Sequence, residues 1–142
     1  MASRALDPQI DRLYQLPLDE FTAARNALAK EAGPDAASVR SLSKPPVAAW
    51  AVNQLFWHNR KVWDELIGAA DKARQAHKAV LSGKTGDVRS LTAAHNEAIE
   101  AALKTTIDLL TEAGHPETDS TRQAIVTTLR ALPSDRTGRL IV

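Results

Sequence analysis

The sequence predicts an all-α protein, a helical bundle formed as a single domain over residues 1–142. Apolar residues recur at the three- and four-residue spacing of helices along most of the chain. Alanine is abundant, the chain has only 6 glycines, and aromatic residues make up 4%. Runs in which Val, Ile, Thr or Tyr alternate with polar residues are missing, which argues against strands.

Short helices are expected at the start of the chain. Residues 8–15 should form one or two helical turns, and Pro17 then starts a second helix. Asp19 and Glu20 place negative charge in its first turn, where the helix dipole favours it. The glycine–proline pair at 33–34 separates this helix from another short one.

The segment 47–57 should form a central, buried helix. Pro45 and Pro46 stop the preceding helix, because the residue before a proline avoids the helical region. Asn53 and Gln54 are the exceptions on an otherwise apolar surface. Since a helix without a polar face is normally buried on all sides, we place it at the centre of the bundle. At residues 58–61 the chain either bends or continues.

Two long amphipathic helices should follow as an antiparallel hairpin, because only the short turn at 82–86 joins them. Asp87 is expected to cap the second helix. Small residues on both stripes would let the helices approach closely and leave apolar surface for a partner. The predicted stripes are Val62, Leu66, Ala70, Ala73, His77 and Val80 in the first helix; Val88, Leu91, His95, Ala98, Ala102, Thr105 and Leu109 in the second; and Ile99, Leu103, Ile107 and Leu110 as a second stripe there.

A last helix should begin with a capping box formed by Ser120 and Gln123. Pro133 ends it and leaves a short tail at about 134–142. Because the tail finishes on Leu140, Ile141 and Val142, it is one candidate surface for self-association.

Charge is balanced overall but not locally. The chain has 18 Lys+Arg and 17 Asp+Glu, which argues against a dedicated polyanion-binding protein. Residues 44–85 are net basic and residues 86–121 net acidic, so the two arms of the hairpin carry opposite signs. We expect Lys72 and Arg74 to face Glu97 and Glu100 across it.

The sequence also limits compartment and chemistry. The absence of cysteine excludes disulfides, thiolate catalysis and zinc–thiolate sites. The first residues have no apolar stretch typical of a signal peptide, and the longest uncharged run, 45–59, is shorter than the roughly 20 residues of a membrane span. We therefore expect a cytoplasmic protein without a membrane segment.

Three segments resemble a family of all-helical bacterial proteins of unknown function, of the actinobacterial type. They are LYQLPLDEFTAARNALAK at 13–30, VRSLSKPPVAAWAVNQL at 39–55, and TTLRAL at 127–132 followed by GRL at 138–140. The resemblance spans nearly the whole chain, with the hairpin its least specific part. It implies a bacterial cytosolic helical domain and assigns no activity, cofactor or active-site residue.

The sharpest candidate site is formed by Trp50, Asn53 and Trp57, whose spacing places them on one face of the central helix. One interpretation is a ligand or partner pocket with two aromatic walls and an amide. The other, which we favour, is a core helix whose Asn53 satisfies a neighbouring backbone group.

A second candidate is a metal site at His77 and His95, which should lie on facing arms of the hairpin. The Glu-x-x-His pairs of di-metal helical bundles are missing, so two partly buried histidines at the seam are the simpler interpretation. We find no arrangement of residues typical of catalysis and expect no enzymatic activity and no cofactor.

The basic residues Arg74, Lys78, Lys84 and Arg89 converge near the turn of the hairpin. Such a basic tip could contact nucleic-acid phosphates, although no aromatic residues accompany it. The sequence thus favours a scaffold or protein-interaction module that can self-associate. The alternatives are a nucleic-acid-associated regulator and a metal- or small-ligand-binding bundle.

Overall fold

The computed structural model describes residues 7–132, and these residues form an all-α fold without strands. The predicted fold class is therefore confirmed. The helices are α1 (Asp7–Leu13), α2 (Leu18–Glu31), the 3-10 turn η2 (Gly33–Asp35), α3 (Ala36–Arg40), α4 (Val47–His58), α5 (Arg60–Leu81), α6 (Val88–Glu112) and α7 (Asp119–Ala131).

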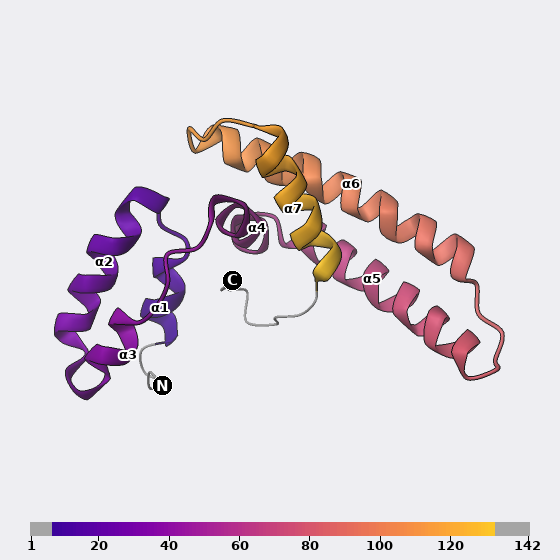
Figure 1. The fold of residues 1–142 in the computed structure, drawn as a ribbon, viewed down its shortest axis with the longest axis horizontal. Coiled ribbons are helices and arrows are strands. Elements are labelled where there is room, and N and C mark those ends of the chain that lie inside the picture. The colour runs from indigo at the N-terminus through magenta and orange to yellow at the C-terminus, as the bar shows by residue number, and fades with distance from the viewer. Residues whose placement is uncertain (1–6, 133–142) are drawn as a thin grey trace.

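The helices form an elongated arrangement with α4 near its middle (Figure 1). The first three helices gather at one end, whereas the α5–α6 hairpin projects to the other. Helix α7 crosses the hairpin near α4 and covers one of its sides. The predicted tail at 134–142, with Leu140, Ile141 and Val142, lies outside the described residues.

The first three helices have small cores of their own. In one, the rings of Tyr14 and Phe21 meet edge to face with centroids 5.3 Å apart, beside Ile10 and Leu13. Arg25 Nη1 donates to the carbonyl oxygen of Leu42 at 3.0 Å and so closes the connection after α3. The first three helices therefore bury apolar side chains against one another.

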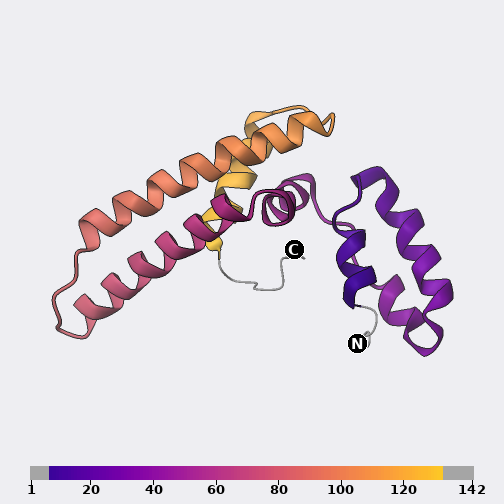
Figure 2. The same ribbon diagram turned by 180° about the vertical axis from the view of Figure 1, so that it is seen from behind.

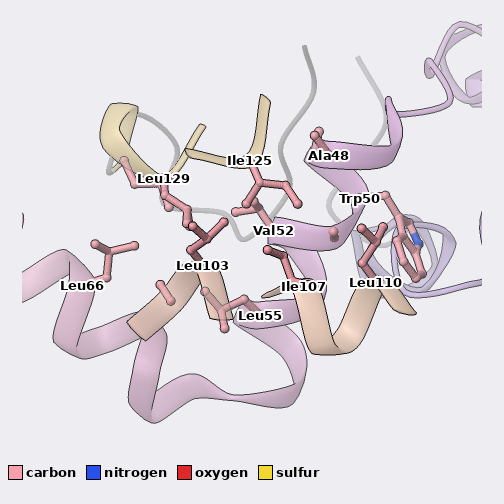
Figure 3. Packing of buried hydrophobic residues seen from close by; sticks show 14 of the residues in the cluster. Ala48, Trp50, Val52, Leu55, Leu66, Leu103, Ile107, Leu110, Ile125 and Leu129 are labelled. Atoms are coloured by element: carbon pink, nitrogen blue, oxygen red, sulfur yellow. The ribbon is translucent and has the colours of Figure 1, made fainter. Parts of the chain in front are cut away.

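Helix α4 is the buried central helix that the sequence predicts. Every residue from 48 to 55 is buried, the amides of Asn53 and Gln54 included. Its apolar side chains pack against α6 and α7 (Figure 3). The shared core contains Val52, Leu55, Leu66, Leu103, Ile107, Leu110, Ile125 and Leu129.

The chain bends between α4 and α5 at Asn59, which resolves the alternative that the sequence leaves open. Asn59 leaves the helical region with φ −144° and ψ 70°, and its Oδ1 accepts from the Val62 N–H at 3.2 Å. Asparagine is a good N-cap, so this residue ends one helix and begins the next.

The hairpin turn is built as predicted. Gly83 has φ 78°, a left-handed conformation that favours glycine. Asp87 caps α6 by accepting from the Ser90 N–H at 3.2 Å. The predicted cap of α7 is wrong, however: Thr118, not Ser120, accepts the capping hydrogen bond, from Thr121 N–H at 3.1 Å. Thr118 has an extended backbone, whereas Ser120 already lies in the first turn.

The buried stripes of the hairpin differ from the prediction at the tip. Leu66, Ala70 and Ala73 are buried, but His77 and Val80 are exposed and Ala76 is buried instead. In α6 the second predicted stripe is fully buried, since Ile99, Leu103, Ile107 and Leu110 all lie in the core, whereas in the first predicted stripe only Ala102 is buried and the rest are half-buried. The hydrophobic periodicity predicts the helices of the hairpin, but it does not show how far along the hairpin α7 covers them.

Within residues 7–132, no helix combines the length and the apolar character that crossing a bilayer requires.

Candidate functional site

A cleft of about 540 Å³ lies where the N-terminal helices meet α4 and the end of α6; we call it the Trp50 cleft. Trp50 donates from Nε1 to the Leu16 carbonyl oxygen at 2.8 Å, and its ring lies edge-on to His115 with centroids 5.4 Å apart. The lining residues are Gln15, Pro17, Leu18, Asp19, Trp50, Gln54, His58, Leu109, Glu112, Ala113, Gly114 and His115.

The residues of α4 in this cleft are Trp50, Gln54 and His58, which follow one another at helical spacing. Asn53 and Trp57, predicted with Trp50, do not line it. Asn53 is completely buried, and the Trp57 ring lies edge-on to Phe56 with centroids 4.8 Å apart. The structure therefore separates the predicted trio.

Gln54 makes a structural contact that the sequence interpretation missed. Its Nε2 donates to the Tyr14 carbonyl oxygen at 2.8 Å and, more weakly, to the Trp50 carbonyl oxygen at 3.3 Å. Together with the Trp50 indole, it ties α4 to the segment after α1. The signal was present in the sequence, because Gln54 is one of only two amides in an otherwise apolar helix.

The two predicted histidines line a smaller cleft of about 240 Å³, which we call the Arg130 cleft. His77 is exposed, contrary to the expectation of two partly buried residues, whereas His95 is half-buried. Burial, followed by the positive charges of Arg130 and Arg74, lowers the pKa of His95 from its usual value. Among residues 7–132, no group of three or more His, Asp or Glu could hold a metal ion.

The four predicted basic residues, Arg74, Lys78, Lys84 and Arg89, are all exposed. Lys78, Lys84 and Arg89 lie near the turn of the hairpin, whereas Arg74 lies one helical turn closer to its middle. Arg74 Nη2 pairs with Asp71 Oδ1 at 2.7 Å on its own helix. The expected pairing across the hairpin is not observed, because neither ion pair between described residues joins α5 to α6. A partner one turn away is easier to reach than one on the facing helix.

One broad side of the hairpin is uncovered. Figure 2 shows that no described helix crosses the side opposite α7. Arg130 of α7 donates to Asn96 Oδ1 at 3.1 Å, which marks the covered side of α6. Ala98 and Thr105 lie roughly 160–180° around the helix from Asn96. The opposite side, which we call the open face, thus carries Ala98 and Thr105, and both are half-buried.

Charge is segregated along the hairpin. Its tip half, residues 72–96, has five Lys and Arg and one Asp, whereas its base half, residues 60–71 and 97–112, has three Lys and Arg and seven Asp and Glu. The hairpin is therefore net +4 at its tip and net −4 at its base. The basic side chains of the tip half and the acidic ones of the base half are exposed, apart from the half-buried Asp71.

Comparisons of the chain with family models, with curated protein sequences and with solved structures find no match.

Proposed function

We propose that the protein is a non-enzymatic interaction module that self-associates through the open face of the α5–α6 hairpin. In this arrangement two copies pack antiparallel, with the tip of each hairpin over the base of the other. The observation that carries the proposal is the segregation of charge, net +4 at the tip and net −4 at the base, on a hairpin with one uncovered side.

The open face is large enough to form an interface. Helix α6 has 25 residues, which corresponds to a length of about 37 Å, and two adjacent helices are about 20 Å wide. This face therefore offers about 750 Å², close to the roughly 800 Å² that each partner buries in a standard interface. Small residues such as Ala98 allow helices of a second hairpin to approach closely.

The charges favour the antiparallel orientation. A parallel pair would place basic tip on basic tip, whereas a two-fold antiparallel pair places each basic tip on an acidic base, twice by symmetry. Glu65 lies near the start of α5 and Lys78 near its end, and both are exposed. A second copy is thus complementary to the first at both ends.

The first experiment measures mass by light scattering over a concentration series. The wild type should dimerise, and Ala98→Glu should shift it to monomer because a carboxylate would be buried in the interface. Ala93→Glu is the matched control: it changes the same residue type on the same helix, on an exposed position roughly 140° away. It should leave the dimer intact.

The second experiment reverses charges. A tip-reversed protein carries Lys78→Glu and Lys84→Glu, and a base-reversed protein carries Glu65→Lys and Asp108→Lys. Each alone should dimerise at least about tenfold more weakly, while an equimolar mixture should recover a heterodimer. A strictly monomeric wild type contradicts the proposal, and so does an equimolar mixture that forms no heterodimer.

The same variants test the nucleic-acid alternative. A monomeric wild type that binds labelled DNA or RNA at low salt, with binding lost in the tip-reversed protein, would replace self-association with phosphate contact by the basic tip.

A further inference from the structure

The Arg130 cleft lies where the end of α7 approaches the middle of the hairpin. Three helices contribute to it, and none of its lining residues is acidic. Its volume is about 240 Å³, and the lining residues are Ala70, Ala73, Arg74, His77, Thr92, His95, Arg130, Ala131 and Leu132. Two guanidinium groups, two imidazoles and a hydroxyl therefore surround one small space.

Both arginines are held in place and still have donors left. Asp71 accepts from Arg74 at 2.7 Å, and Asn96 accepts from Arg130 at 3.1 Å. Each of these bonds uses one N–H of a guanidinium group that has five. Since Asn96 is neutral, the charge of Arg130 is not balanced by its partner.

Two buried polar atoms at the cleft have no hydrogen-bond partner within residues 7–132. They are Thr92 Oγ1 and His95 Nε2. Leaving a buried polar group without a partner is costly, so such atoms call for an explanation. At this cleft both belong to groups that can donate a hydrogen bond to an oxygen atom.

The positive charge around His95 agrees with this arrangement of donors. Arg130 and Arg74 each lower the pKa of His95, in addition to burial, so both cations act on the imidazole. An anion in the cleft would offset this positive charge.

From this arrangement we propose that the Arg130 cleft binds a small phosphate-type oxyanion. Its donors come from three helices and therefore approach from several directions, which suits the oxygens of a tetrahedral anion better than the two of a carboxylate. Arginine is favoured at sites that recognise phosphate, because its planar group presents a fork of N–H donors. The site is independent of the open face, which lies on the other side of the hairpin.

The test uses inorganic phosphate and the full chain, followed by NMR of the four histidine side chains. A His95→Gln spectrum assigns the His95 signal. Phosphate should shift that signal saturably and raise the pKa of His95, because a dianion favours the protonated imidazole. Acetate at equal ionic strength should shift the His95 signal much less. The signal of His58, which lines the Trp50 cleft, should not respond to either anion.

Variants locate the site. Arg130→Gln and Arg74→Gln should each weaken phosphate binding about tenfold or more, since each removes a charge-assisted contact. Arg122→Gln is the matched control, an exposed arginine of α7 that pairs with Glu117 outside the cleft. If circular dichroism shows that Arg130→Gln does not fold, two other variants provide the test. Arg130→Lys should keep part of the phosphate binding, and Thr92→Val should reduce it. A His95 signal that does not respond to phosphate, or equal weakening by Arg122→Gln, overturns the proposal.

Discussion

The base half and the tip half of the hairpin are made of the same two helices but differ in what holds them together. In the base half, large side chains such as Leu66, Ile99 and Leu103 are buried against α4 and α7. In the tip half the buried residues are Ala73 and Ala76, whereas Val88 and Leu91 are half-buried. Val80 and Leu81 are 48% and 87% exposed.

This difference follows from the number of layers. Two helices alone can bury only the narrow strip where they face each other, whereas a third element creates an enclosed space for leucine and isoleucine. An alanine contributes little apolar area, so the tip half depends on helix propensity, caps and the turn. The tip is therefore the part of the hairpin that would gain most from the proposed second copy on the open face.

The largest expected effect on stability tests this difference between the two halves. It compares the change from leucine to alanine at two positions of α5. Leu66→Ala should lower the free energy of unfolding by about 3 kcal/mol, because Leu66 is completely buried in the base half. Leu81→Ala in the tip half should change it by less than about 0.5 kcal/mol. Urea unfolding of the Ala98→Glu protein, which we expect to be monomeric, carrying either change measures both, and equal losses would contradict the contrast.

Features that depend on residues close together in the sequence could be predicted from it. The buried helix α4 follows from its apolar surface, and the Asp87 cap follows from a residue type at a helix start. The exposure of His77 was not predictable, because periodicity along α5 does not reveal where α7 ends.

The candidate sites were predicted less well because they depend on contacts between distant segments. Gln54 bonds to Tyr14, 40 residues earlier, and Arg130 bonds to Asn96, 34 residues earlier. Neither spacing has a local signature. The spacing of His77 and His95 on a hairpin did place them in one cleft, since an antiparallel pair fixes which levels face each other.

The next effect concerns two glycines, one in each half. A Cβ on Gly86 would lie 2.7 Å from the backbone oxygen of Ala76, whereas a Cβ on Gly68 would meet nothing within 4 Å. Gly86→Ala should therefore destabilise the tip by about 2 kcal/mol, and Gly68→Ala in the helix should stabilise the base by about 1 kcal/mol. Amide hydrogen exchange of α5 and α6 measures both, and the same sign for both variants would contradict the structure.

A smaller effect compares the two N-caps. Asn59 caps α5 in the base half and Asp87 caps α6 in the tip half. Replacing either with alanine should cost about 1 kcal/mol locally. For Asn59→Ala the loss should appear in global urea unfolding, while for Asp87→Ala it should appear mainly as faster hydrogen exchange near residues 88–92, because the tip can open by itself. A purely global loss for Asp87→Ala would mean that the two halves unfold together.

The smallest effect is the pH dependence at His95, where the tip half meets the end of α7. Its folded-state pKa lies below the usual 6.5, so as the pH falls the unfolded chain takes up the proton first. Stability is thus fully present above about pH 6.5 and declines as the pH falls towards the folded pKa. Urea unfolding at pH 7.5 and 5.5 in phosphate-free buffer should show a larger decline for the wild type than for His95→Gln.

Arg130→Gln provides the control for this pH effect, because it removes one of the two cations that lower the pKa of His95 but leaves the imidazole in place. It should reduce the decline without abolishing it, since burial is the largest cause of the shift. If the decline is the same in all three proteins, protonation of His95 does not account for the loss of stability, and the lowered pKa of His95 is contradicted.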